Sequence, residues 1–142
     1  MITGVASVGN GADTLHYAYR PGLSQLETAT WCNSQDAELN SRTFAYDAYH
    51  RLTGIKLNGV SEVGYTLNDR DQRTVEQYPG VNWNYGYDDK GQLTGAEKSA
   101  GDVSEIDSYT YDGIGNRLTA QEGASQFSYT SNLLRRIVFA QN

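Results

Sequence analysis

One short pattern recurs along this chain, and it constrains the fold more than any other feature. The pattern reads aromatic, spacer, Tyr-Asp, a short turn and then Leu-Thr, and its clear copies occupy 44–54, 85–95 and 109–119. Three weaker copies begin at Tyr17, Tyr65 and Phe127. Self-similarity at a loose spacing of about 20 residues is typical of a repeat architecture with loops of variable length between fixed units.

Each copy predicts a β-hairpin. Aromatic residues at alternate positions point to one face of a strand, where the leucine of the returning strand can meet them. The aspartate can accept hydrogen bonds from backbone amides, and a glycine three residues later supplies the positive φ of a type I turn with a bulge. Gly91 and Gly115 fill that position, whereas His50 and Asp71 replace glycine with residues that tolerate it. The leucine of the third clear copy comes one residue late, at Leu118, which predicts an extra bulged residue.

Turn signals also separate the repeats, at Asn58-Gly59, Pro79-Gly80, Ser99 to Asp102 and Glu122 to Ala124. With a reversal after every strand, the sequence predicts an all-β fold, an antiparallel meander of tandem hairpins forming a curved strip or part of a hollow shell. The least certain stretch is 27–41, which lacks a clear period. The expected strands lie near 13–20, 26–31, 42–47, 51–57, 60–67, 72–77, 81–88, 92–98, 103–112, 117–121, 125–130 and 134–139.

The repeats define the expected domain organisation: an N-terminal extension over 1–14, an array of about six hairpin repeats over 15–139, and a tail over 140–142. The 11 tyrosines, 15 glycines and absence of long helix-forming runs fit such a β-rich chain. The repeat positions expected to carry the structure are Tyr19, Tyr46, Asp47, Leu52, Leu67, Tyr87, Asp88, Gly91, Leu93, Tyr111, Asp112, Gly115, Leu118 and Tyr129.

Charge and composition exclude several classes of function. A net charge of -6 lacks the basic surface that nucleic-acid phosphates require, so we expect no nucleic-acid partner. A single cysteine, Cys32, permits no internal disulfide. The start has no signal-peptide pattern, and no apolar stretch approaches the length of a membrane span.

The sequence offers little for catalysis or metal binding. Cys32, His50 and Asp47 form the only possible Cys-His-Asp set, but the turn explains two of them, and no catalytic motif surrounds Cys32 or His16. The acidic residues of 68–71 and 88–89 could suggest calcium, yet they lack the glycine and distal glutamate of a calcium loop. We therefore expect turn capping, no metal, no cofactor and no enzymatic activity.

The repeated residues resemble the Rhs, or YD-repeat, family: bacterial Rhs proteins, the cocoon-forming subunits of insecticidal Tc toxin complexes, and the extracellular barrels of teneurins. The resemblance covers roughly 15–139. It implies hairpins joined side by side into a strip that spirals into a hollow shell, which in the toxin members encloses a C-terminal effector. Other YD-repeat segments would then be its partners, and an effector would be the cargo. The chain would be part of a larger bacterial protein that is secreted or lies at the cell surface.

Two departures from the family limit what the resemblance implies. The chain has no Asp-Pro and no recognisable core segment, so the self-cleavage of the family toxins is carried over to no residue. We therefore expect a mid-shell fragment or a remnant of a larger gene. The alternative is a carbohydrate-binding or adhesion module, in which rows of tyrosines with Trp31 and Trp83 stack on sugar rings. Solvent exposure of Tyr46, Tyr87 and Tyr111 discriminates between the two.

Overall fold

The computed structural model describes residues 3–7, 13–131 and 137–141, and all regular structure in these ranges is strand. The predicted all-β fold is confirmed. No helix of these ranges is both long and apolar enough to cross a bilayer. The strands are β1 (Thr3–Ser7), β2 (Thr14–Tyr19), β3 (Leu26–Cys32), β4 (Glu38–Tyr46), β5 (Leu52–Leu57), β6 (Val60–Leu67), β7 (Arg73–Tyr78), β8 (Val81–Tyr87), β9 (Leu93–Ala100), β10 (Val103–Tyr111), β11 (Arg117–Glu122), β12 (Ser125–Ser131) and β13 (Ile137–Gln141).

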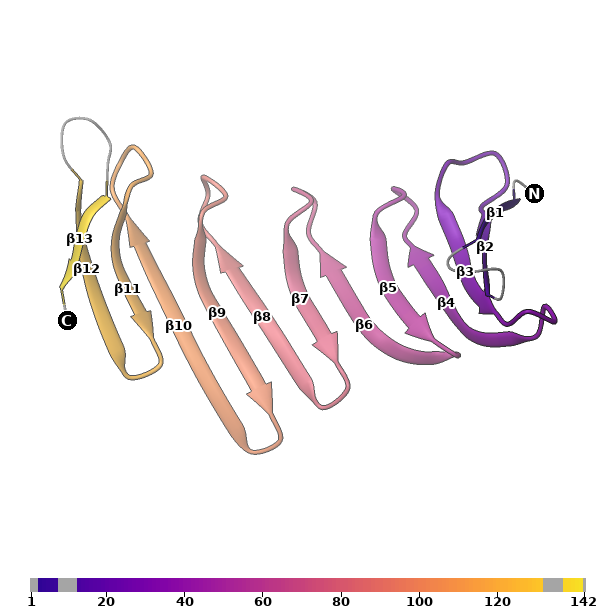
Figure 1. Cartoon of the computed structure of the whole chain (residues 1–142). Coiled ribbons are helices and arrows are strands. Elements are labelled where there is room, and N and C mark those ends of the chain that lie inside the picture. The colour runs from indigo at the N-terminus through magenta and orange to yellow at the C-terminus, as the bar shows by residue number, and fades with distance from the viewer. Residues whose placement is uncertain (1–2, 8–12, 132–136, 142) are drawn as a thin grey trace. The chain divides into compact units, whose positions relative to one another are not determined.

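The chain divides into two compact units, Met1–Tyr65 and Thr66–Asn142. In the first unit each strand from β1 to β5 pairs antiparallel with the strand that follows it in sequence. The second unit continues the same way from β7 to β13. Within each unit, successive turns lie alternately at one end of the strands and at the other (Figure 1). Each unit is thus a meander, as the sequence predicts.

Two strands differ from the expected boundaries at the ends of the chain. β1 lies inside the stretch expected to be an extension and pairs with β2, from Thr3 opposite Ala18 to Ser7 opposite Thr14. No strand is predicted here because 1–12 holds no aromatic residue and several glycines. At the other end, β13 starts at Ile137 and reaches Gln141, while 134–136 of the expected last strand fall outside the described residues.

The Tyr-Asp hairpins share one register. Each ladder shifts by one residue just before the turn, so that Tyr46 lies opposite Leu52 and Tyr87 opposite Leu93. In the third clear copy Tyr111 lies opposite Arg117 with the same shift, so the extra bulged residue predicted there is wrong. Arg117 takes the place of the leucine, and Leu118 moves to the next position of the strand, where it is 42% exposed.

The turns between repeats form where the sequence places them. Asn58 and Gly59 have φ of 50° and 81°, the left-handed pair of a two-residue hairpin turn. Gly80, Gly101 and Gly123 also have positive φ in their turns. These glycine turns confirm the predicted reversals.

One further turn, in the stretch without a clear period, was not predicted. The Asn33 side chain accepts hydrogen bonds from the amides of Gln35 and Ala37, at 2.9 and 3.0 Å. Asp36 occupies the left-handed position with φ of 62°. This turn joins β3 to β4, so β4 begins at Glu38, earlier than expected.

The core is thin because each unit is a single sheet. Three of the buried residues are alanines, which pair with tyrosines of the preceding strand: Ala29 with Tyr17, Ala96 with Tyr85 and Ala120 with Tyr109. A methyl group opposite a tyrosine leaves room for the ring to lean across the sheet. In these three pairs the small residue of the returning strand thus lies opposite the first aromatic residue of the repeat.

Candidate functional site

The Tyr-Asp turns are the feature that most distinguishes this sheet, and all have one geometry. In the turn after β8, the Asp88 carboxylate accepts hydrogen bonds from the amides of Lys90 and Gln92, both at 2.9 Å. The Asp88 amide donates to the Gln92 carbonyl at 3.0 Å, and the Gly91 amide donates to the Asp88 carbonyl at 3.0 Å. The same bonds recur in the turns that begin at Asp47, Asn68 and Asp112.

The left-handed position of each turn is occupied as predicted. Gly91 and Gly115 have φ of 81° and 93°, while His50 and Asp71 have φ of 66° and 60°. The two acidic stretches considered for calcium provide the capping side chains Asn68 and Asp88. The Oδ1 atom of each accepts hydrogen bonds from two backbone amides. Their oxygens thus have the capping role that the sequence favours.

Two of the capping carboxylates have pKa values below the ordinary range. For Asp112, the side-chain hydrogen bond from Asn116 at 2.7 Å is the main cause, with backbone amides of the turn adding to it. For Asp47, the backbone amide of Arg51 lowers the pKa most, and the Arg51 guanidinium, at 2.7 Å, lowers it further. Both turns are therefore stabilised by an ionised aspartate.

The tyrosine before each aspartate links its hairpin to the preceding one. The Tyr46 hydroxyl donates to the Leu26 carbonyl at 2.9 Å, and the Tyr111 hydroxyl donates to the Leu93 carbonyl at 2.8 Å. Tyr87 donates in the same way to the Arg73 carbonyl at 2.8 Å. Each acceptor is the residue that begins the returning strand of the preceding hairpin, a connection that phenylalanine could not make.

These tyrosines are half-buried, which bears on the two alternatives left by the sequence. Tyr46, Tyr87 and Tyr111 are all intermediate in exposure, with their hydroxyls bonded to backbone carbonyls. The observation favours rings that hold hairpins together over rings presented to a sugar. Tyr19 and Tyr129 are also half-buried, and the Arg117 guanidinium lies 5.9 Å from the centre of the Tyr129 ring.

A second set of links joins neighbouring turns and was missed by the sequence analysis. The Gln72 side chain donates to the carbonyl of Gly91 in the next turn at 3.0 Å, and Gln25 donates to the carbonyl of His50 at 2.6 Å. In each case a glutamine at the end of one turn reaches the left-handed residue of the next. Lys90 adds a similar link to the Gly113 carbonyl at 2.7 Å. Glutamine just before the returning strand is the sequence signal.

A buried carboxylate in the second unit accepts hydrogen bonds from two tyrosine hydroxyls. Glu76 is 7% exposed and accepts hydrogen bonds from the hydroxyls of Tyr78 at 2.7 Å and Tyr85 at 3.0 Å, together with the Arg73 guanidinium at 2.9 Å. Burial by itself would raise the pKa of Glu76, but these three partners outweigh it and lower the pKa. Burial, followed by the bond to Glu76, raises the pKa of Tyr85 to about 12.

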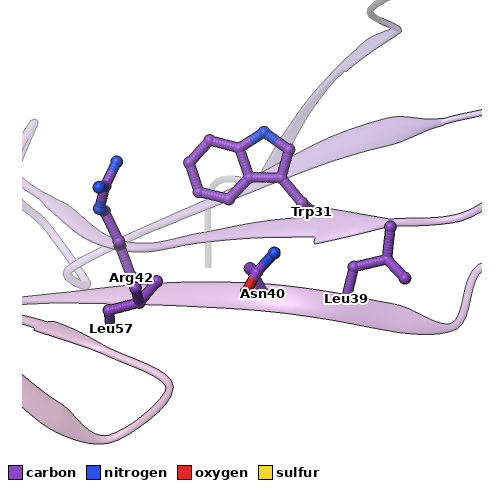
Figure 2. A pocket seen from close by; sticks show the side chains of 5 residues that line it. All are labelled: Trp31, Leu39, Asn40, Arg42 and Leu57. Carbon is purple, nitrogen blue, oxygen red and sulfur yellow. The ribbon is translucent and has the colours of Figure 1, made fainter.

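A shallow recess of about 320 Å³ lies in the first unit (Figure 2). The Arg42 guanidinium lies 5.9 Å from the centre of the Trp31 ring and pairs with Glu62 at 2.9 Å. Trp31, a candidate for stacking on sugars, thus already has a cationic partner. The lining residues come from β3, β4 and β5 and are Trp31, Leu39, Asn40, Arg42 and Leu57.

The structure does not bring together the Cys-His-Asp set considered from the sequence. Cys32 lies opposite Glu38, the first residue of β4, whereas Asp47 and His50 follow the last. The length of β4, about 26 Å at ~3.3 Å per residue, separates them. Cys32 instead lies near His16 and Asp36, the one group of potential metal ligands found among the described residues.

Within each unit the tandem hairpins form a sheet, and three of these hairpins are closed by a Tyr-Asp turn and linked to the preceding hairpin by a tyrosine hydroxyl, which defines a β-hairpin repeat fold. Solved structures of Tc toxins contain this fold. The crystal structure of TcdB2-TccC3-Cdc42 matches 97% of this chain with a TM-score of 0.61 and 17% identity. A Photorhabdus luminescens Tc holotoxin pore matches 97% with a TM-score of 0.64 and 16% identity. The crystal structure of TcdB2-TccC3 matches 90% with a TM-score of 0.63 and 17% identity.

The match is one of fold, and it involves a small part of the larger proteins. This chain spans 9%, 9% and 8% of the length of the three matching chains, in the same order. No protein-family model matches the chain, and no curated protein matches it in sequence. The resemblance to Tc toxin proteins is thus supported in the backbone fold.

Proposed function

We propose that this chain is a non-catalytic structural segment of a YD-repeat protein and forms part of the wall of a shell that encloses a toxin effector. The observation that carries the proposal is the use of the repeat side chains. The tyrosine hydroxyls and turn aspartates bond to the backbone of their own or a neighbouring hairpin. Side chains whose polar groups bond to the backbone in this way support a structural role, because they leave few polar groups available for catalysis.

The partners follow from the same proposal. They are other YD-repeat segments, which would continue the sheet, and an effector held as cargo inside a secreted or surface-exposed bacterial protein. β13 pairs with β12 and ends the strand order of the described residues, so its other edge can accept a further strand. The apolar run Ile137-Val138-Phe139 favours such pairing.

Sedimentation velocity over a range of concentrations tests whether the chain pairs through this edge. We expect self-association that a Phe139→Lys change reduces, because a lysine on an edge strand opposes strand pairing. Ile114→Lys is the matched control, since Ile114 is 74% exposed but lies in a turn. A stable monomer at high micromolar concentration would contradict the proposal and favour a self-sufficient domain.

The carbohydrate-binding alternative predicts a different result. Sugar stacking on the tyrosine face would require exposed rings, and it would change the tryptophan fluorescence of Trp31 or Trp83. We expect no saturable change when oligosaccharides are added. A saturable change that Trp83→Ala abolishes would support the adhesion module instead.

A further inference from the structure

Three side chains with different metal-binding atoms lie close together in the first unit, near the turn between β3 and β4. In the β2–β3 ladder Thr14 lies opposite Cys32 and His16 opposite Thr30. His16 and Cys32 are therefore diagonal neighbours on one face of the sheet. The turn that begins at Asn33 then folds Asp36 back over them, so that the His16 Nε2 and Asp36 Oδ1 atoms are 3.1 Å apart.

The distances fit the needs of a tetrahedral metal ion. One ligand atom from each of His16, Cys32 and Asp36 lies within 4.8 Å of the other two. Bond lengths of about 2.0–2.3 Å place the ligand atoms of a tetrahedral zinc ion roughly 3.3–3.8 Å apart. The group must therefore close by only about 1 Å. The side chains of His16 and Asp36 are 38% and 74% exposed, so both have room to rotate.

The chemistry of the three groups selects the metal. Imidazole nitrogen, thiolate sulfur and carboxylate oxygen together are ligands of zinc, whereas calcium and magnesium take oxygen ligands. The local charge also favours a cation. Burial raises the pKa of the Cys32 thiol, and the negative charges of Asp36 and Glu38 raise it further. A divalent cation at this position would offset the negative charges of the two carboxylates and favour the thiolate form that binds a metal.

We propose that His16, Cys32 and Asp36 bind a zinc ion, with a fourth position open to water. Binding transfers the thiol proton to solvent and leaves the thiolate on the metal. The ion would join β2, β3 and the β3–β4 turn. This turn lies at the other end of β4 from the Tyr-Asp turn that follows it (Figure 1). This site is independent of the proposed wall function, since either could hold without the other.

Titration of the whole chain with Co²⁺, followed by displacement with Zn²⁺, tests the site. We expect one ion per chain, a thiolate-to-cobalt charge-transfer band, and visible bands of a tetrahedral centre that zinc removes. Zinc should also raise the melting temperature. His16→Gln and Asp36→Asn should each weaken zinc binding at least about tenfold, because each removes a direct ligand. Cys32→Ser should abolish the charge-transfer band.

The chain provides matched controls for these variants. Asp71 has the left-handed turn position that Asp36 has, with φ of 60° against 62°, so Asp71→Asn repeats the substitution away from the site. His50→Asn removes the other histidine at a position where asparagine is tolerated. Both controls should bind zinc as the unchanged chain does. Absence of stoichiometric binding, or equal affinity in the Asp36→Asn and Asp71→Asn variants, would overturn the proposal.

Discussion

The hydroxyl of Tyr111 donates a hydrogen bond to the backbone carbonyl of Leu93, 2.8 Å away and one hairpin earlier in the chain. The same relationship joins Tyr46 to Leu26 and Tyr87 to Arg73. The repeated tyrosine thus places an apolar ring on one face of the sheet, and its hydroxyl donates a hydrogen bond to the backbone of the preceding hairpin. A chain with a thin core can use these bonds to hold successive hairpins in register.

Tyr111→Phe removes this donor while keeping the ring. We expect a loss of about 1 kcal/mol in the free energy of unfolding, because a part-buried carbonyl loses its side-chain partner. Urea denaturation followed by circular dichroism measures the change. Tyr49→Phe is the matched control, since Tyr49 is 78% exposed in a turn and should be neutral. Equal effects of the two substitutions would show that the inter-hairpin bond contributes nothing.

Gly91→Val tests the left-handed turn position. A β-branched residue at φ of 81° is strained, so we expect destabilisation of about 1 kcal/mol or more. The added Cβ would also lie 3.1 Å from the Gln72 amide nitrogen that links the two turns. Gly113→Val, at a glycine with ordinary φ and open space around its Cβ, should change the melting temperature much less. The bulged-turn geometry would be refuted by unchanged thermal unfolding of Gly91→Val.

Tyr85 should give the sheet an alkaline limit. Its pKa in the folded chain is about 12, above the value of about 10 for an unfolded tyrosine. The stabilisation from the protonated hydroxyl is therefore complete below pH ~10 and is lost as the pH rises through ~12. The tyrosinate absorbance of the unchanged chain minus that of Tyr85→Phe should titrate near 12. A difference curve centred near 10 would contradict the bond to Glu76.

Asp112 should give the opposite dependence at acid pH. Its pKa is lowered in the folded chain, so its contribution is present above the unfolded value of about 3.9 and lost as the pH falls through the folded value. Asp112→Asn keeps a capping oxygen, as Asn68 does in the equivalent turn, but cannot titrate. We expect the denaturation midpoint of this variant to vary less between pH 5 and pH 2. Parallel curves for the two proteins would contradict the assignment.

The sequence predicts those parts of the fold that single residue types specify. Asn58-Gly59, Gly91 and Gly115 mark their turns because few residues adopt positive φ easily, and each turn forms as expected. Asp36 adopts positive φ as well, but no Tyr-Asp precedes it, so its turn and the start of β4 were missed. Leu118 lies outside the position that the repeat predicts for its leucine, because the turn length and not the leucine sets the register of the third hairpin.

The contacts between hairpins were harder to predict, because they depend on register across strands. The hydroxyl of Tyr111 can reach Leu93 only once the β9–β10 ladder is fixed. The link from Gln72 to Gly91 joins two different turns, and the group of His16, Cys32 and Asp36 likewise joins residues of two strands and a turn. A sequence period reveals each hairpin but not which atoms of two hairpins meet.

Residue-resolved amide hydrogen exchange at low protein concentration tests most directly the central claim that the hairpins of a unit pair side by side in one sheet. β9 pairs with β8 on one side and β10 on the other, so all its inner amides should exchange slowly. β13 pairs with β12 alone among the described strands, so every second amide there should exchange fast. Fast exchange at every second amide of β9 would mean that one of its neighbours is absent, and would contradict the account.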